Sequence, residues 1–300
     1  MKNEPLVSII MNCYNGEKYL RDAINSVISQ KYNNWELIFW DNLSTDKSSE
    51  IFNSYKDNRL KYYCAQSHSN ILYKAKNYAL EKTNGDFIAF LDVDDWWLPN
   101  KLERQIPLFK DSEVGLVYGN VWLFFEKENK KKIYRKKKLP KGKIVNDLLY
   151  DYSIGSPTYV VRKKFLNDPK FNFNNNFHII GDFDLNVRLA YKYKVDCIQD
   201  PVAYARIHGK NESLLKKDLE IKELKIWFYE MQKNPTFSLL KSLNEIKKKI
   251  LYLETKQDIF NGKIKEAFFK TINYPFSIKK LKLAIALISF KFKLLKLRKY

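Results

Sequence analysis

Three carboxylates lie within four positions at the end of a short apolar run. Residues 87–91 are continuously apolar, and Asp92, Asp94 and Asp95 follow them. A run this short, bounded by a glycine and a proline, is typical of a buried central strand of a parallel sheet. Acids placed this close repel one another unless a cation lies between them, and oxygen ligands suit Mg²⁺ or Mn²⁺. The stretch therefore indicates a divalent-metal site whose natural occupant carries a diphosphate.

The same acids have a simpler interpretation. Acidic side chains are common in the first turn of a helix, where the helix dipole favours negative charge, and Pro99 could open a helix here. The local pattern does not separate the two interpretations, so the rest of the chain has to do so.

Strand-like and helical segments alternate over residues 6–91. The predicted strands are residues 6–11, 35–40, 60–64 and 87–91, with helical patterns between them. Such alternation predicts an α/β fold with a doubly wound, mostly parallel sheet and right-handed crossovers. Because ligands bind beyond the carboxyl ends of such strands, the polar residues that end the first two strands should share one cleft with the acids. These residues are Asn12, Tyr14, Asn15, Asp41 and Asn42.

Two common phosphate-binding motifs are missing from the sequence. No G-x-G-x-x-G follows the first strand, and no G-x-x-x-x-G-K-[ST] loop occurs. Their absence removes the usual dinucleotide-binding and P-loop NTPase interpretations. A metal ion would then have to hold the phosphates.

Several blocks of residues 6–213 resemble glycosyltransferase family 2, whose members have the GT-A fold. The blocks are 7–20 (VSIIMNCYNGEKYL), 29–30 with 35–38, 41–46 (DNLSTD), Lys76 with Asn77, 85–86 and 90–95. The resemblance implies that the acidic stretch is the D-x-D-type motif of the family. Asp94 and Asp95 would then contact the ribose and the metal-bound diphosphate, with Asp92 and Lys76 also on the donor side.

One position departs from the family pattern. The family commonly has two adjacent acids where this chain has Asp41 and Asn42, and the second usually accepts a hydrogen bond from uracil N3–H. Asn42 can still accept through its amide oxygen, but it can also donate. The resemblance therefore favours a UDP-sugar as donor and leaves another base open.

Two later segments complete the resemblance. Residues 181–189 (GDFDLNVRL) resemble the family's E-D-x-D-L-x-x-R-L helix, which implies that Asp182 is the general base; Gly181 stands where a Glu is common. Without the family pattern, Asp182 would be an ordinary acid at a helix start. Residues 206–208 (RIH) resemble the R-x-H element that closes over the diphosphate, so the expected metal ligands are Asp94, Asp95 and His208.

The resemblance also predicts the domain organisation. Residues 1–213 would form the GT-A domain, with a nucleotide-sugar-binding half at 1–125 and an acceptor and catalytic half at 126–213. Residues 214–300 would form a basic helical region. Trp96 and Trp97 could supply an aromatic platform for the acceptor, although a place in the core is an equal alternative.

The net charge of +20 is unevenly distributed along the chain. Residues 127–143 hold ten Lys or Arg against one acid, and residues 210–300 hold 22 against nine. A helix over 278–297 would carry an apolar stripe, and it could pack on the fold or lie in an anionic membrane interface. The stripe is Leu281, Ile285, Ile288, Phe292 and Leu295.

Composition gives an expectation for the compartment. The sequence has no apolar run near the roughly 20 residues of a membrane span, and residues 1–5 do not resemble a signal peptide. Its three cysteines, Cys13, Cys64 and Cys197, form no C-x-x-C pair, so neither a disulfide framework nor a zinc site is expected. We expect a cytoplasmic protein, with a peripheral position on the cytoplasmic face of a membrane left open.

The leading hypothesis is a metal-dependent inverting glycosyltransferase of polysaccharide biosynthesis. It would move a sugar from a nucleotide diphosphate sugar to a hydroxyl of a cell-surface glycan or a lipid-linked acceptor. A nucleotidyltransferase is the second hypothesis, although a glycine-rich phosphate loop would be expected near its N-terminus. A non-enzymatic module binding nucleic acid or membrane ranks third, because no nucleic-acid-binding signature accompanies the charge. No nucleic-acid partner is therefore expected.

Overall fold

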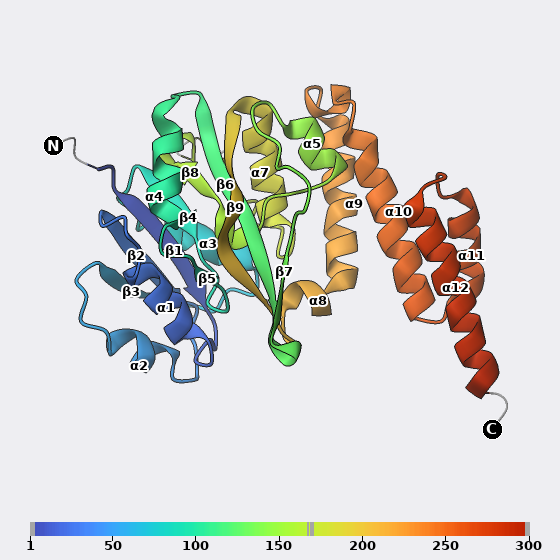
Figure 1. The fold of residues 1–300 in the computed structure, drawn as a ribbon, viewed down its shortest axis with the longest axis horizontal. Helices are drawn as coiled ribbons and strands as arrows, with labels where there is room; N and C mark the ends of the chain where they lie inside the picture. Colours follow the sequence, from blue (N-terminus) through green and yellow to red (C-terminus); the bar gives the residue numbers. More distant parts are fainter. Residues whose placement is uncertain (1–3, 167, 169–170, 298–300) are drawn as a thin grey trace. The chain divides into compact units, whose positions relative to one another are not determined.

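The computed structural model describes residues 4–166, 168 and 171–297, with side chains described up to residue 289 (Figure 1). The chain forms two compact units, Met1–Asn211 and Glu212–Tyr300. Each unit is considered by itself below.

The first part of the N-terminal unit has the predicted alternation of strands and helices. Strands β3, β2, β1 and β4 lie side by side in that order and are all parallel. Every residue of β1 and β2 is buried, in keeping with their mostly apolar sequences, and the buried Ser8 hydroxyl donates to Glu36 of the neighbouring strand. The strands are β1 (Val7–Cys13), β2 (Trp35–Asp41), β3 (Leu60–Cys64) and β4 (Phe87–Phe90), and the helices are α1 (Leu20–Ile28), α2 (Ser48–Asn53) and α3 (Leu72–Leu80).

The sheet continues beyond β4 as a mixed sheet. Strand β8 is antiparallel to both β4 and β6, and β9 runs parallel to β6. The short β5 pairs with β9, and β7 pairs with β6 as a hairpin. The predicted α/β class with a doubly wound sheet is confirmed. The strands are β5 (Trp96–Trp97), β6 (Val114–Phe125), β7 (Lys130–Ile133), β8 (Val160–Arg162) and β9 (Lys194–Ile207).

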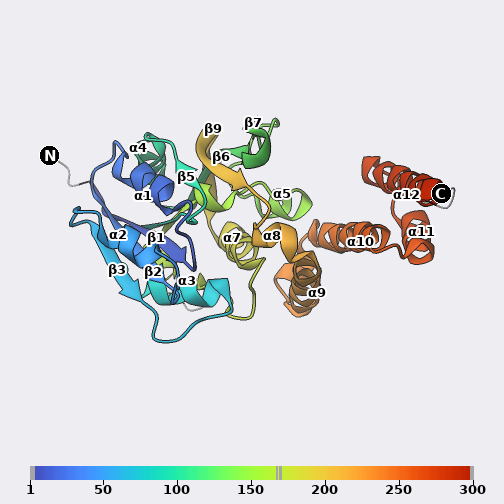
Figure 2. The same ribbon diagram turned by 90° about the horizontal axis from the view of Figure 1, so that it is seen from below.

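Several helices lie among the later strands of this unit. They include the helix that begins at Gly181, as the family pattern implied (Figure 2). The helices are α4 (Lys101–Gln105), α5 (Val145–Tyr150), α6 (Lys163–Leu166) and α7 (Gly181–Lys192), with the 3₁₀ turn η3 (Ser156–Thr158).

The position of α4 decides between the two interpretations of the acidic stretch. Helix α4 begins at Lys101, and the acid in its first turn is Glu103. Asp92, Asp94 and Asp95 instead lie between β4 and β5, just beyond the carboxyl end of a buried parallel strand. The simpler interpretation, as helix-start acids, does not hold.

Close packing of β4 against β1 depends on a glycine. A Cβ at Gly85 would lie 2.6 Å from Ser8 N and 2.7 Å from Leu6 O. Both are backbone atoms that cannot move aside, so a side chain here would push β4 away from β1. Gly85 therefore fixes the start of the strand that ends at the acids.

The C-terminal unit is helical, as expected. Helices α10, α11 and α12 share a small core of Ile259, Ala267, Tyr274, Leu283 and Leu287. Among the described residues, no helix is both long enough and apolar enough to cross a membrane. The helices are α8 (Glu212–Leu215), α9 (Lys217–Lys233), α10 (Leu243–Phe260), α11 (Ile264–Asn273) and α12 (Ile278–Leu297), with the 3₁₀ turn η5 (Phe237–Leu239).

The predicted helix over 278–297 is confirmed as α12, and its core-facing residues differ from the predicted stripe. Leu283 and Leu287 are buried, whereas Leu281, Ile285 and Ile288 are more than half exposed. The side chains of the other two stripe members, Phe292 and Leu295, lie outside the described residues.

Candidate active site

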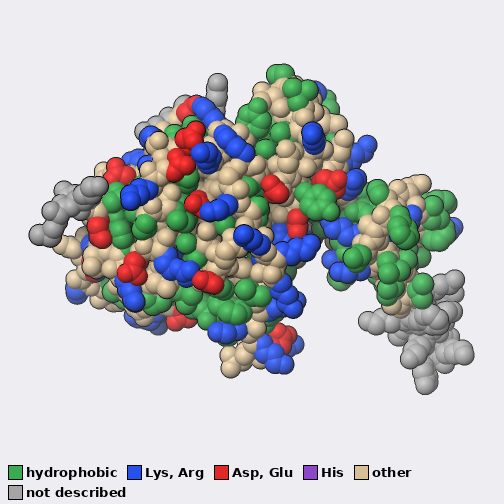
Figure 3. All heavy atoms as spheres, turned by 45° about the horizontal axis from the view of Figure 1, so that its top comes forward, with side chains coloured by type: hydrophobic (Ala, Val, Ile, Leu, Met, Phe, Trp, Pro, Cys, Tyr) green, Lys and Arg blue, Asp and Glu red, His purple; other side chains and the backbone are tan. Residues whose placement is uncertain are grey.

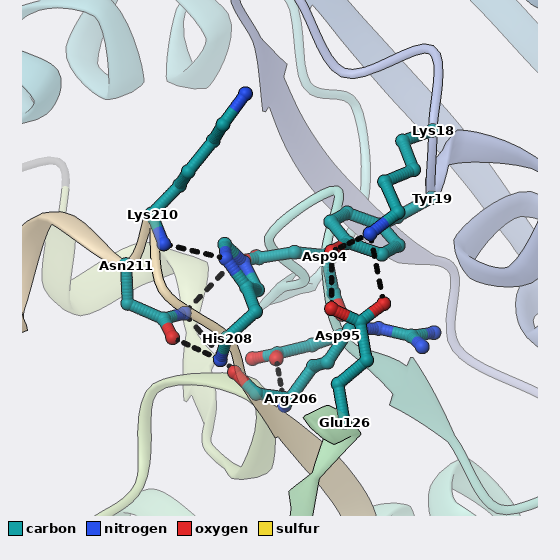
Figure 4. Close-up of polar contacts among 9 residues, drawn as sticks. All are labelled: Lys18, Tyr19, Asp94, Asp95, Glu126, Arg206, His208, Lys210 and Asn211. Atoms are coloured by element: carbon teal, nitrogen blue, oxygen red, sulfur yellow. Dashed lines mark hydrogen bonds and ion pairs between the residues drawn. The ribbon is translucent and has the colours of Figure 1, made fainter.

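The side chains of Asp94 and His208 are in contact, although the two residues lie far apart in the sequence of the N-terminal unit. Asp94 follows β4, and His208 follows β9; His208 Nε2 lies 3.0 Å from Asp94 Oδ2 (Figure 4). Asn211 Nδ2 donates to the same carboxylate oxygen at 3.3 Å, and Asn211 Oδ1 accepts from His208 N–H at 2.6 Å. Lys210 N–H donates to His208 Nδ1, so the ring proton is on Nε2 and is donated to Asp94.

The electrostatics around Asp94 favour a cation. Burial raises the pKa of Asp94, and the charge of Asp92 raises it further, while His208 opposes the shift. A divalent cation at this carboxylate would relieve both unfavourable effects. Among the described residues no group of three or more His, Cys, Asp or Glu forms a complete metal site. A cation at Asp94 and His208 would therefore need oxygen ligands from a substrate or water.

Asp95 has a different environment from Asp94. Its side chain is buried, and its Oδ1 accepts from Arg206 N–H at 2.8 Å, which ties the acidic turn to β9. Burial raises the pKa of Asp95, and the charges of Asp94 and Asp92 add to the effect. Its assignment to the metal stays a prediction.

Arg206 holds the same region together by its side chain. The guanidinium lies 4.5 Å from the ring centroid of Tyr19 and 4.6 Å from that of Trp96. It also forms an ion pair with Asp22 at 2.7 Å. The Arg206 guanidinium therefore covers part of the Trp96 ring. Trp97 is buried in the core and donates its indole N–H to Pro157 O.

The loop after β1 is fastened near His208 by residues that the sequence interpretation did not single out. Tyr19 has its ring centroid 5.1 Å from that of His208, and its hydroxyl donates to Glu126 Oε2 at 2.8 Å. Lys18 Nζ lies 3.0 Å from Glu126 Oε1 (Figure 4). Lys18 and Tyr19 fall inside a family-like block, but no sequence signal points to Glu126 as their partner.

A buried lysine links the acidic stretch to the predicted base. Lys76 on α3 is 1% exposed, and its Nζ lies 2.9 Å from Asp92 Oδ1. Ser156 donates its hydroxyl to Asp92 Oδ2 at 3.1 Å. The positive charge of Lys76 also lowers the pKa of Asp182. Lys76 therefore acts electrostatically on both Asp92 and Asp182, and its predicted place on the donor side stays a prediction.

Asp182 lies in the first turn of α7 and is only partly buried. Its Oδ1 accepts from Phe183 N–H at 2.7 Å. Burial raises the pKa of Asp182, and Lys76, the Phe183 N–H and Tyr73 act against the increase. A carboxylate whose pKa is raised towards the working pH is suited to general-base catalysis.

The neighbouring acid Asp184 forms an ion pair with Arg188. It is 3% exposed, and its Oδ2 lies 2.6 Å from Arg188 NH2, one helical turn along α7. Both carboxylate oxygens accept from the Arg188 guanidinium, so they are not available to an acceptor hydroxyl. The geometry thus favours Asp182 over Asp184 as the base.

The lack of a side chain at Gly181 is explained by the neighbouring ring of Tyr73. A Cβ at position 181 would lie 2.3 Å from Cδ2 of the Tyr73 ring. Tyr73 is buried and packs against Phe173 with ring centroids 5.0 Å apart, so it cannot move aside cheaply. The Glu that the family commonly has here would not fit. The only sequence signal for Tyr73 is its place one helical turn before Lys76.

On the nucleotide side, Asp41 and Asn15 hold loops together. Asp41 Oδ1 accepts from Ser44 N–H, and its Oδ2 accepts from the Tyr62 hydroxyl, both at 2.7 Å. Asn15 Oδ1 accepts from Thr45 N–H at 2.8 Å. These two predicted ligand contacts therefore already have protein partners.

Asn42 makes a two-way contact with a single residue. Its Oδ1 accepts from Ser69 N–H, and its Nδ2 donates to Ser69 O, both at 2.9 Å. One lone pair of Oδ1 remains for a ligand. The amide thus holds the loop after β3 and keeps one acceptor position.

Asn12 and Tyr14 are the most available groups at this edge of the sheet. Tyr14 is 52% exposed, with its ring centroid 4.4 Å from that of His68. Asn12 is buried, and neither polar atom of its side chain has a hydrogen-bond partner within the described part of the chain. Because buried amides normally have partners, Asn12 is suited to a ligand.

Known proteins resemble this chain in sequence and in fold. An Escherichia coli protein named UDP-Glc:alpha-D-GlcNAc-diphosphoundecaprenol beta-1,3-glucosyltransferase WfgD is 38% identical over 168 residues, which cover 56% of this chain and 64% of that protein. Alignments with a Haemophilus influenzae protein named uncharacterized glycosyltransferase and with the Bacillus subtilis protein named putative teichuronic acid biosynthesis glycosyltransferase TuaG cover 48% and 41% of their length. This chain therefore matches less than two thirds of their length.

Solved structures show the same fold at low sequence identity. S. aureus TarS 1-349 in complex with UDP-GlcNAc has a TM-score of 0.67 at 20% identity, covering 95% of this chain and 80% of that one. The mannosyltransferase PcManGT from Pyrobaculum calidifontis, in complex with GDP-Man and Mn²⁺, has a TM-score of 0.64 at 14% identity, covering 97% and 81%. The predicted GT-A-type architecture is confirmed.

The family model described as glycosyl transferase family 2 matches residues 8–169, more than half of the chain. This span contains the acidic stretch, Lys76 and the loop after β1. The predicted family and enzyme class are confirmed, and the chain belongs to glycosyltransferase family 2.

Proposed function

We propose that this protein transfers a sugar from a nucleotide diphosphate sugar to a hydroxyl group, with inversion at the anomeric carbon. The observation that carries the proposal is the contact of Asp94 with His208 beyond the carboxyl end of β4. Ligands of open α/β sheets bind at such strand ends. Asp182 lies close enough to Asp92 for their charges to interact, so a base and an acidic donor site are neighbours.

The residues present fit a divalent cation that is shared with a substrate. Asp94 and His208 would hold it, in place of the proton that they now share, and Mg²⁺ commonly combines one or two carboxylates with substrate phosphates. A ligating Nε2 requires the ring proton on Nδ1, so the contact from Lys210 N–H would have to open. When bound, the cation would neutralise charge on the departing diphosphate.

The chain's own groups account for the proton transfer. Asp182 removes the proton from the acceptor hydroxyl as the acceptor oxygen bonds to the anomeric carbon. The bond from that carbon to the diphosphate oxygen breaks on the opposite face, and the electron pair leaves with the diphosphate. Lys76 favours the ionised form of Asp182 before the step, and Phe183 N–H orients the carboxylate.

The names of the similar proteins guide the choice of substrates. WfgD is named for UDP-Glc and a diphosphoundecaprenol-linked GlcNAc, and TarS was solved with UDP-GlcNAc. We infer a UDP-sugar donor and a lipid-linked saccharide acceptor for this chain, in glycan biosynthesis. The enzyme would then work at the cytoplasmic face of a membrane, where such an acceptor is anchored.

Titration calorimetry with UDP and GDP, each with and without Mn²⁺, tests the donor site. We expect UDP to bind more tightly than GDP, and Mn²⁺ to increase UDP affinity in the wild type but not in Asp94→Asn. A protein that binds neither nucleotide with Mn²⁺ present would contradict the proposal. The reaction products distinguish this function from that of a nucleotidyltransferase, because glycosyl transfer releases UDP whereas nucleotidyl transfer releases pyrophosphate.

A further inference from the structure

The connection between α11 and α12 presents five large apolar side chains to solvent. Phe276, in the connection itself, is 99% exposed, and the other four are all more than half exposed. They lie within about one helical turn of the connection on either side, so they share one end of the helical hairpin. We call this set the hairpin tip: Phe269, Ile272, Phe276, Ile278 and Leu281.

The core of the C-terminal unit does not account for the hairpin tip. Helix α11 buries Ala267 and Thr271, and α12 buries Leu283 and Leu287, on faces other than those of the tip residues. Figure 3 shows hydrophobic side chains gathered over the surface of this helical unit. Large contiguous apolar surfaces are uncommon on soluble monomers and usually mark an interaction site.

The sequence that follows Glu266 and carries the hairpin tip is strongly basic. Residues 267–300 contain no acid and nine Lys or Arg. Lys279 and Lys282, next to Ile278 and Leu281, are exposed. Lys270 is paired with Asp258 at 2.7 Å, and Lys280 donates to Ile272 O at 2.6 Å, so these two brace the tip.

We propose that the hairpin tip inserts into the interface of an anionic lipid membrane. Aromatic and aliphatic side chains beside lysines suit the boundary between headgroups and acyl chains. A second copy of this chain is a poorer occupant, because the basic tip would face a protein of net charge +20. The proposal deepens the proposed function, which places the acceptor in a membrane, yet vesicle binding requires neither donor nor acceptor.

Vesicle co-sedimentation of the full chain at low salt tests the proposal, with phosphatidylcholine vesicles compared with vesicles containing phosphatidylglycerol. We expect binding to the anionic vesicles that weakens as salt is added. The triple variant Phe269→Ser/Phe276→Ser/Ile278→Ser should bind at least about tenfold more weakly, since it removes the apolar part of the interaction. Lys279→Glu/Lys282→Glu should weaken binding mainly at low salt.

Leu239→Ser is the matched control, because Leu239 is 82% exposed in η5, outside the hairpin tip. It should bind vesicles like the wild type, and the helical circular-dichroism signal and the melting curve should be the same in all variants, which shows that the helical unit is folded. A wild type that ignores anionic vesicles, or a triple variant that binds them equally well, would overturn the proposal. So would light scattering that shows an oligomer of the wild type dispersed by the triple variant, without vesicle binding.

Discussion

His208 Nε2 donates to Asp94 Oδ2 across 3.0 Å, joining the end of β9 to the turn after β4. Asp95, the next residue along, faces the backbone of Arg206 instead. Adjacent carboxylates thus have different partners: one meets a side chain that could share a cation, and the other holds a strand in place.

The first prediction separates these two carboxylates. Asp94→Asn should abolish the increase in UDP affinity that Mn²⁺ produces, while leaving thermal stability close to that of the wild type. Asp95→Asn should lower the melting temperature, because its carboxylate accepts from Arg206 N–H in a buried position. Calorimetric titration and thermal unfolding measure the two effects. If only Asp95→Asn removes the Mn²⁺ effect, Asp95 is the metal ligand.

The second prediction concerns the base. Asp182→Asn should lower kcat by about 10²-fold or more with little change in UDP affinity, since a general base acts only in the chemical step. Steady-state kinetics and calorimetry with the same preparation provide the measurement.

Asp184→Asn is the matched control on the same helix. It should mainly cost stability, on the order of 3–5 kcal/mol, because it leaves the Arg188 guanidinium beside a neutral amide. If Asp182→Asn retained the wild-type kcat, the general base would have to be another residue.

The third prediction follows from the charge of Lys76. Lys76 lowers the pKa of Asp182 against the effect of burial, so Lys76→Met should raise that pKa. The base must be ionised, and activity is therefore lost as the pH falls through its pKa. The acidic limb of the kcat–pH profile should move to higher pH in the variant. Lys74→Met, an exposed position on the same helix, should leave the profile unchanged.

The fourth prediction tests the packing of Gly181 against Tyr73. Gly181→Ala should destabilise the protein by about 1–3 kcal/mol, because its Cβ would overlap the Tyr73 ring. Denaturant unfolding of the single variants and of Gly181→Ala/Tyr73→Ala measures the coupling between the two sites. Purely additive costs would show that the ring does not limit position 181.

The sequence by itself determined the class of fold and predicted most members of the candidate site. Mostly apolar strands alternating with helices favour a buried parallel sheet, and parallel strands bring their carboxyl ends to one edge. For that reason Asn12, Asp41 and the acids after β4 could be expected together. The family pattern then supplied Asp182 and His208, which lie far from the acids in the chain.

Tertiary structure decided what each of those residues is free to do. Whether Asp94 or Asp95 meets His208 depends on the twist of one turn, and the chain pattern is the same in either case. The pairing of Asp184 with Arg188 and the fit of Tyr73 over Gly181 depend on contacts between segments and on side-chain rotamers. Likewise, the sequence of α12 offers several apolar rows, and only packing against α10 and α11 selected Leu283 and Leu287 for the core and left Leu281 exposed.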